Sequence, residues 1–525
     1  ADKERLGAQL VELHSRRLRS GELADDELQE SLGRLETILE SVGQLRTDDL
    51  ASVLLQARHQ QAYRLTIAWW ERPDDPKLRT EARTALIALE PRFATFLEES
   101  RLAEEELQTK LDSEEQERQV EAITTRMNAI RAASLRVLFY AAWNDLYSAT
   151  TAPVEQQPDE LARSLQRFSE FLGYDPGRDG DSIDAESMEL EIPLRARAGL
   201  GLALGLHLSD QGLAADRWLA ALGDDRVAAE VRTERFGEVL LFLLVTGRAQ
   251  QALAISRPLV DQLRPPAKVP EVRWARTLAR SGEIAFLAGS SDATALRSLG
   301  YEALVRLRQF SLADRILEEF SVEPPLATNA WLGWLVGHRA LAAAEASNQV
   351  TDFRQAAVAL VHARELPGSR SDNASLGRMT LEAGWAHHRG EEYEAAAREF
   401  EQAIPLLKSH DRELAVEAAW MRALALQQTA QSDPERQRDA LDAFQRVVLE
   451  FADHPKATEA RYQIARLQRG SGDSARSLAS LEAIPSSDPN YALARFELIG
   501  LRFENWKKAP DEIAKAAAYR IPVSY

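Results

Sequence analysis

The chain has 525 residues, of which 45% are apolar and 28% are charged, and it contains no cysteine. Its formal net charge of −18 argues against broad binding to nucleic acid or anionic membranes, since both attract basic surfaces. The lack of cysteine excludes a disulfide framework, thiolate catalysis and cysteine-ligated metal clusters. No apolar run approaches the roughly 18 residues that a membrane-spanning helix needs.

Nearly every long segment predicts an α-helix, because apolar residues recur three and four positions apart and strand-like alternation is missing. In the first region, residues 1–150, helices are expected over Lys3–Arg19, Asp26–Val42, Asp48–Trp70 and Pro76–Glu90. Pro91 suits the first turn of a further helix, and helical pattern then continues to about Tyr147. The run Asp112–Gln116 resembles a capping box, so either one helix or two could fill this stretch.

A repeating pattern of small and bulky residues marks the C-terminal third. Gly384 is followed after twelve residues by Ala396, after four more by Phe400 and after three more by Ala403. This pattern resembles the tetratricopeptide repeat (TPR), a helix–turn–helix unit of about 34 residues. The resemblance implies that a small residue on the first helix nests against a small residue on the second, while the aromatic residue fills the gap between units. The family's tryptophan position holds Thr380, which departs from the pattern.

Further units support this interpretation. One contains Trp420, Ala440, Phe444 and Val447, and another contains Ile464, Ala465, Ser477, Leu481 and Ile484. Upstream the pattern is weaker, as in Trp331–Gly333 followed by Ala356, Leu360 and Ala363. The turn before two of the second helices carries a glycine, Gly390 or Gly472, as a tight turn favours.

The predicted fold is all-α: a right-handed α-solenoid of TPR-like helix pairs, preceded by an N-terminal, partly coiled-coil-like helical region. The sequence leaves open whether that first region is an independent domain. A last helix near residues 490–507 should end the solenoid, and the polar residues Asn505, Lys507 and Lys508 suit a solvated end. The expected order is long helices (1–150), a linker with a short helix and an acidic loop (151–189), degenerate repeats (190–375), TPR repeats with a terminal helix (376–508) and a C-terminal tail (509–525).

Three segments suggest site chemistry, but each has a simpler interpretation. His388 and Glu392 are spaced like a metal pair on a continuing helix, yet Gly390 falls where the repeat turns. The glycines Gly199, Gly201 and Gly205 resemble a dinucleotide loop, but the third is one position late and no strand precedes it, so close helix packing is expected. The loop 175–191 is rich in carboxylates without EF-hand spacing, so it predicts a solvated loop. The sequence therefore predicts no metal, no cofactor and no catalysis.

The resemblance to TPR proteins implies a concave groove lined by the first helices, with exposed positions free to bind a protein or peptide. These positions hold Arg378, Leu381, Trp385 and His388 in one unit, and Glu459, Tyr462, Arg466 and Arg469 in another. Trp385 could equally pack between adjacent units. Aromatic and arginine side chains are enriched at binding hot spots. Two arginines on one face of an acidic protein favour an acidic or C-terminal carboxylate ligand.

Segment 444–473 resembles periplasmic repeat proteins of the Tol–Pal system and of outer-membrane biogenesis, which bind partners and are not catalysts. The lack of cysteine fits an oxidising compartment, and a start at Ala1-Asp2 would fit a processed mature end. The sequence thus predicts a non-catalytic scaffold for protein partners in the bacterial cell envelope, with the cytoplasm as the alternative location. Two other functions stay open: a structural subunit that oligomerises into a large assembly, and an all-α hydrolase or lyase with a carboxylate-lined site.

Overall fold

A computed structural model describes residues 27, 30–35, 37 and 48–510, apart from 115, 154, 176–182, 288, 290, 369–371, 433, 487 and 509. Every regular element in these residues is a helix, which confirms the all-α prediction for this part of the chain. The chain divides into two compact units, Ala1–Leu307 and Arg308–Tyr525. The helix predicted over Lys3–Arg19, most of the helix over Asp26–Val42, part of the acidic loop and nearly all of the tail 509–525 lie outside the described residues. The finer domain limits stay predictions.

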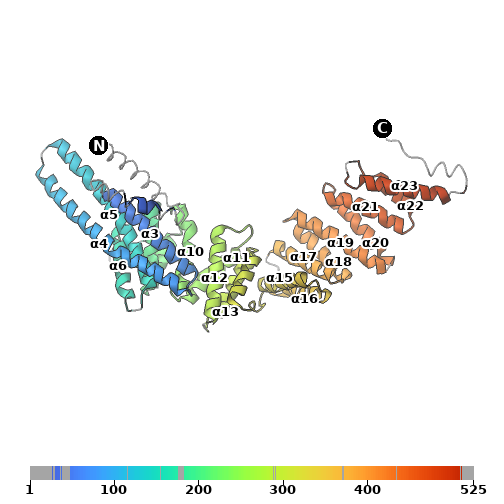
Figure 1. Ribbon diagram of the computed structural model, residues 1–525, viewed down its shortest axis with the longest axis horizontal. Helices are drawn as coiled ribbons and strands as arrows, with labels where there is room; N and C mark the ends of the chain where they lie inside the picture. The colour runs from blue at the N-terminus through green and yellow to red at the C-terminus, as the bar shows by residue number, and fades with distance from the viewer. Residues whose placement is uncertain are drawn as a thin grey trace. The chain divides into compact units, whose positions relative to one another are not determined.

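The described part of the first unit includes three long helices, α3 (Asp48–Glu71), α4 (Pro76–Ser113) and α5 (Glu117–Thr151), and the shorter α6 (Gln157–Leu172) after them. Figure 1 shows α4 and α5 side by side as a long helical hairpin. The buried residues of α4 repeat on one face, from Ala82 through Leu86 and Phe93 to Leu107, as expected for a helix that packs along its length.

Two expectations for α4 and α5 need correction. Pro91 does not begin a helix but lies inside α4, whose start is capped instead by the Asp75 carboxylate. The stretch does hold two helices, yet Ser113 is the last residue of α4 and the residue before α5 is Gln116. The capping box predicted for Asp112–Gln116 is therefore wrong, because Asp112 and Ser113 are still inside α4 and Gln116 makes no side-chain cap hydrogen bond to α5.

The described helices that follow in the first unit are α8 (Pro193–Leu208), α9 (Gly212–Ala221), α10 (Ala229–Val245), α11 (Ala249–Gln262), α12 (Val269–Leu287) and α13 (Ala293–Arg306). The glycines of α8 allow close packing, as the sequence indicated. A Cβ at Gly199 would approach the ring of Trp218, and a Cβ at Gly201 would overlap the ring of Phe168. These glycines lie where neighbouring side chains press on the helix.

The long-helix region is not independent of the helix pairs that follow it. The ring of Trp70 in α3 meets Phe242 of α10 edge to face, with 5.9 Å between centroids. The Glu71 carboxylate accepts hydrogen bonds from Arg273 at 2.5 Å and from Arg276 at 2.6 Å, both in α12. Helix α3 of the long-helix region therefore packs on the helices that follow within the same unit.

Helices α12 and α13 of the first unit approach so closely that their backbones meet at two glycines. A Cβ at Gly282 would lie 2.5 Å from the Cα of Arg297, and a Cβ at Gly300 would overlap the backbone of Ala279. Beside this contact the buried Glu283 carboxylate accepts from Nε of Arg297 at 2.8 Å. Glycine at both positions lets the two backbones touch, so a larger side chain must push the helices apart.

A buried histidine lies in the same unit, inside a cluster of aromatic rings. The ring of His59 lies 6.4 Å from Phe93, 5.2 Å from Tyr140 and 6.0 Å from Tyr147. Its side chain is buried, and its Nδ1 has no hydrogen-bond partner among the described residues. Burial lowers the pKa of His59 to about 3, because the cluster cannot solvate a charged imidazole.

The second unit consists of helices joined by short turns: α14 (Phe310–Phe320), α15 (Ala330–Ser347), α16 (Val350–Glu365), α17 (Asn373–Arg389), α18 (Tyr393–Lys408), α19 (Arg412–Ser432), the 3₁₀ turn η3 (Pro434–Arg436), α20 (Gln437–Glu450), α21 (Pro455–Gly470), α22 (Ser474–Glu482) and α23 (Tyr491–Lys508). From α15 onward each helix packs chiefly on the helix before it and the helix after it (Figure 1). Such nearest-neighbour stacking defines a solenoid, and the predicted fold class is confirmed.

The contacts within the helix pairs follow the sequence pattern. A Cβ at Gly384 would lie 2.7 Å from the ring of Phe400, and the hydroxyl of Ser477 donates to the carbonyl of Ala465 at 2.8 Å. One turn differs from expectation. Gly390 has an ordinary φ of −76°, and the left-handed residue of that turn is Glu391, with φ 60°. The left-handed conformation predicted for Gly390 is therefore adopted by Glu391.

Substituting Gly282→Ala tests the α12–α13 contact. The added methyl group should lower the free energy of unfolding by about 1–3 kcal/mol, because it meets backbone that cannot rotate away. Gly237→Ala is the matched control, since a Cβ at this position in α10 meets nothing within 4 Å. The control should be neutral or stabilising by up to about 1 kcal/mol. Urea unfolding of the full chain measures both, and equal effects would contradict the close contact.

Lowering the pH should reduce the stability of the first unit through protonation of His59 in the unfolded state. Its folded pKa lies below the unfolded value, so the unfolded state binds the extra proton and stability falls as the pH drops from about 6.5 toward 3. Between pH 7 and pH 5 this difference corresponds to a loss on the order of 2 kcal/mol. His59→Phe should remove that loss, whereas the exposed control His362→Gln should keep it. Identical pH dependence of unfolding in wild type and His59→Phe would refute the burial of a neutral imidazole.

Candidate functional site

The candidate site is the surface formed by the first helices of the second unit: α15, α17, α19, α21 and α23. Its main feature is a set of hydrogen bonds from an aromatic side chain on one first helix to a carboxylate on the next. The three bonds run from Trp334 Nε1 to Glu382 Oε2 at 2.8 Å, from Trp385 Nε1 to Glu417 Oε1 at 2.8 Å and from Tyr462 Oη to Glu497 Oε1 at 2.5 Å. We call these the aromatic–carboxylate bridges.

The remaining pair of consecutive first helices, α19 and α21, is joined by contacts of charged side chains. The ammonium group of Lys456 lies 4.7 Å from the ring centroid of Trp420, a cation–π contact. His454 Nε2 lies 3.0 Å from Glu413 Oε2 beside it. Each step between consecutive first helices from α15 to α23 is therefore spanned by at least one polar side chain.

Several residues predicted to recognise a partner take part in these contacts. Arg378 donates to Asp411 at 2.5 Å, and Arg469 donates to Glu504 at 2.9 Å. Glu459 accepts from Lys456 at 2.8 Å on its own helix. The polar groups of these three residues already form hydrogen bonds within the chain. They therefore help to hold the surface in place as well as line it.

Two of the predicted positions are not exposed, and that part of the prediction is wrong. Leu381 is only 6% exposed and belongs to the core formed with residues of α18 and α19. Tyr462 is 8% exposed and packs with Leu481 and Leu498. Both side chains are covered because the next helix packs directly over them. Burial and the Glu497 carboxylate together raise the pKa of Tyr462 to about 12.

Trp385 and His388 form an aromatic group at the end of α17. Of the two roles weighed for Trp385, the structure shows packing: its ring meets Phe400 of the same pair edge to face, with 6.2 Å between centroids, and its Nε1 donates to Glu417 of the next pair. His388 lies between Trp385 and Tyr393, and burial, with a smaller effect of Arg389, lowers the pKa of its imidazole. Its spacing to Glu392 does not bring the two together. His387 Nδ1 contacts Glu392 Oε2 instead, at 2.8 Å.

Arg466 differs from the other predicted residues. Among the eight, all of which are described, it alone has an exposed side chain without a hydrogen bond or ion pair. It lies on α21, which carries Lys456, Arg461 and Arg469 as well and only one acidic residue, Glu459. This helix is thus a local basic surface on a protein of net charge −18.

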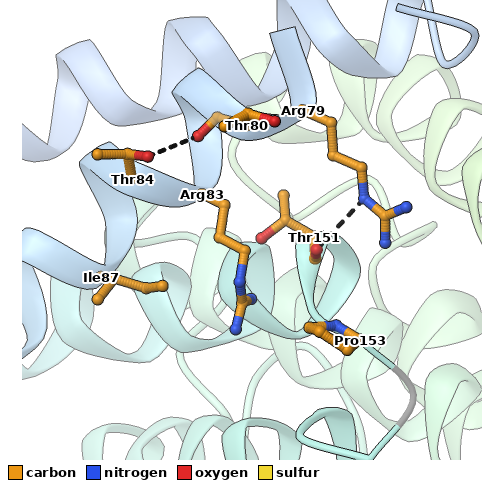
Figure 2. Close-up of a pocket in the computed structure, with 7 residues that line it drawn as sticks. All are labelled: Arg79, Thr80, Arg83, Thr84, Ile87, Thr151 and Pro153. Carbon is orange, nitrogen blue, oxygen red and sulfur yellow. Dashed lines mark hydrogen bonds between the residues drawn. The ribbon is translucent and has the colours of Figure 1, made fainter. Parts of the chain in front are cut away.

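The first unit contains a cavity of about 400 Å³ between the start of α4 and the end of α5. Figure 2 shows its lining residues, Arg79, Thr80, Arg83, Thr84, Ile87, Thr151 and Pro153. Arg79 donates to the carbonyls of Thr151 at 3.3 Å and Ala152 at 3.2 Å, and Arg83 donates to the carbonyl of Ser148 at 3.2 Å. Both guanidinium groups therefore donate to backbone carbonyls at the end of α5. Because they are used in this way, they are less available to bind an anionic ligand.

The alternative of a hydrolase or lyase calls for close, buried carboxylates, and in the described residues the buried Asp145 lies near the partly exposed Glu90. Arg167 donates to Asp145 at 2.7 Å and to Glu90 at 2.9 Å, and Asp145 is 1% exposed. Burial, opposed by the nearby Arg167, raises the pKa of Asp145 to about 8. Neither carboxylate lines the cavity of Figure 2. Arg167 thus links α4, α5 and α6 through these two carboxyl groups.

The acceptors of the bridges, Glu382, Glu417 and Glu497, were not predicted from the sequence. Each follows its aromatic donor by roughly one repeat, at separations of 48, 32 and 35 residues. A carboxylate about one repeat after each aromatic residue was the signal that could have identified these acceptors. The chain has 82 Asp and Glu residues, so this spacing did not stand out. Within the described residues no group of three His, Asp or Glu side chains could hold a metal ion. None of the described helices is both long enough and apolar enough to cross a membrane.

Comparison with known proteins found solved structures of low sequence identity and no other kind of match. No protein-family model matches the sequence, and no curated protein matches it. The crystal structure of yeast Tom70 is 12% identical, with 87% of this chain and 98% of that chain covered at a TM-score of 0.22. A circular tandem repeat protein with novel repeat topology is 13% identical, with 98% and 93% covered at a TM-score of 0.19. These TM-scores are too low for either structure to support an argument, so the fold is assigned from the helix pairs of this chain alone.

A double-mutant cycle tests the bridge between α17 and α19. Trp385→Phe and Glu417→Met should each lower the free energy of unfolding, and their combined effect should fall short of the sum by about 1 kcal/mol, because both remove the same hydrogen bond. Trp385→Phe with Glu413→Met is the control, since Glu413 contacts His454 instead. Additive effects in the first cycle, measured by urea unfolding, would contradict the bridge.

Proposed function

We propose that the second unit is a non-catalytic scaffold that binds protein partners on the surface of its first helices. The observation that carries the proposal is the set of aromatic–carboxylate bridges, which tie consecutive first helices to each other. A surface fixed in this way loses little conformational freedom on binding, so more of the contact energy appears as affinity. Recognition by a pre-formed surface requires no covalent step.

The ligand chemistry follows from α21. Arg466 is exposed and without an ion pair, while Arg469 lies one turn away and is held by Glu504. A free guanidinium group binds a carboxylate well, because its two N–H groups match the two oxygen atoms. The proposed ligand is therefore an acidic segment or a C-terminal carboxylate of a partner protein.

The proposed location is the bacterial cell envelope. Two sequence features support it: the lack of cysteine throughout the chain, and the resemblance of segment 444–473 to periplasmic repeat proteins of the Tol–Pal system. Fractionation of the native cells tests this part by itself. Recovery of the protein with the cytoplasmic fraction would reject the envelope and leave the binding proposal intact.

Charge reversal of the free arginine tests the binding surface. Arg466→Glu should reduce recovery of co-purifying proteins at least tenfold, because an acidic ligand would meet a like charge. The matched control is Arg398→Glu, which alters an exposed arginine on the second helix α18. The measurement compares proteins captured by immobilised wild-type and variant chains. Equal recovery from all three would contradict the assignment of this surface.

A further inference from the structure

Helix α23 is the last described helix of the second unit, and it carries apolar residues on two opposite faces. One face packs into the core, where Ala494, Leu498 and Leu501 lie with Leu481 and Ile484. The other face, which we call the outer face, exposes four large apolar side chains. They are Leu493 at 47%, Phe496 at 75%, Ile499 at 59% and Phe503 at 43% exposure.

The outer face has the pattern of a packing surface. Its four residues follow one another at intervals of three, three and four, which places them on one side of the helix. The sequence predicts a solvated end here from Asn505, Lys507 and Lys508, and that prediction is wrong for this face, because these polar residues lie only in the last turn. A terminal helix of a solenoid normally presents a polar outer side, and a contiguous exposed apolar row marks an interaction site.

Charged residues beside the outer face already have partners within the chain. Glu497 accepts from Tyr462 at 2.5 Å, and Glu504 accepts from Arg469 at 2.9 Å. Arg502 is only 8% exposed. A neighbour that packs on the outer face would therefore meet apolar side chains without burying an unpaired charge. This condition favours an apolar partner surface.

A phenylalanine ring packed on a glycine is a recurring helix contact in this chain. A Cβ at Gly384 would lie 2.7 Å from the ring of Phe400, and a Cβ at Gly201 would overlap the ring of Phe168. Gly500 of α23 is a helical glycine with no such neighbour, since a Cβ there meets nothing within 4 Å. The helix that covers the outer face should therefore place a bulky side chain on Gly500.

The outer face carries both halves of this contact. Phe496, its most exposed side chain, lies four residues before Gly500 and so on the same side of the helix. When two copies of α23 run antiparallel about a two-fold axis level with Leu498, Phe496 of each copy meets Gly500 of the other. The same register sets Leu493 against Phe503. Parallel helices would instead place Gly500 against Gly500 and leave the gap unfilled.

We propose that the outer face of α23 binds the outer face of a second copy of this chain, in an antiparallel dimer in which Phe496 packs on Gly500. Each copy uses the same face, so the contact closes on itself and gives a dimer instead of a lattice. One helix from each copy makes a small interface, so we expect a dissociation constant in the micromolar range. Loss of partner capture by Arg466→Glu is a separate result, since that residue lies on α21.

Sedimentation of the full chain tests the dimer, which should form between about 1 and 100 µM. Gly500→Leu should raise the dissociation constant at least tenfold, because the new side chain takes the place of Phe496 although it makes the face more apolar. Gly237→Leu is the matched control, since Gly237 is a helical glycine of α10 whose Cβ also meets nothing within 4 Å. Undiminished dimerisation of Gly500→Leu would overturn the proposal. A wild-type chain that stays monomeric at about 100 µM would overturn it too, and would leave the face to another segment or a different protein.

Single introduced cysteines report the direction of the two helices, because the chain has no native cysteine. In the antiparallel register the two copies of Ile499 lie about 3 Å apart along the helix axis, and the two copies of Leu493 about 15 Å apart. Mild oxidation should therefore link most of the Ile499→Cys chains into disulfide dimers and few of the Leu493→Cys chains. Leu449→Cys, at a position 79% exposed on α20, measures linkage by random collision. Equal yields at positions 499 and 493, whether high or low, would overturn the proposal.

Discussion

The structure depends on small residues that let a second helix press against a first. In α15 and α17 of the second unit, glycines of the first helix receive Leu360, Leu407 or Phe400 from the second helix. The same device joins α12 and α13 in the first unit, where Gly282 lies against the backbone of Arg297. Side chains larger than glycine would separate these helices and remove the apolar contacts on which each pair depends.

Close pairing fixes how far apart consecutive first helices lie, and this spacing suits the polar side chains that span them. An indole or phenol reaches the next helix and finds a carboxylate there, as Trp385 finds Glu417. The result is a surface whose side chains are held by their neighbours before any partner arrives. The same contacts leave few free groups, so the basic helix α21 with Arg466 becomes the part of the surface that is open to a ligand.

The sequence predicted the fold better than the site. Spacing alone identified the pairs around Gly384 and Ser477, because intrahelical periodicity and small residues decide local packing. It failed where tertiary contacts decide the outcome. Pro91 lies inside α4 although its ring usually marks a helix start, and Leu381 is buried because α19 covers it. Likewise, the acceptor of a bridge lies a repeat away from its donor, and nothing local distinguishes Glu417 from a solvated glutamate.

Side chains of consecutive first helices hold each other in place in the unbound protein. The most direct test of this is the solvent exchange of the indole N–H groups of Trp334 and Trp385, measured by nuclear magnetic resonance. If the bridges to Glu382 and Glu417 exist, both protons exchange slowly and shift when the carboxylates are replaced. Indole protons that exchange as fast as those of a free tryptophan would contradict the pre-formed surface.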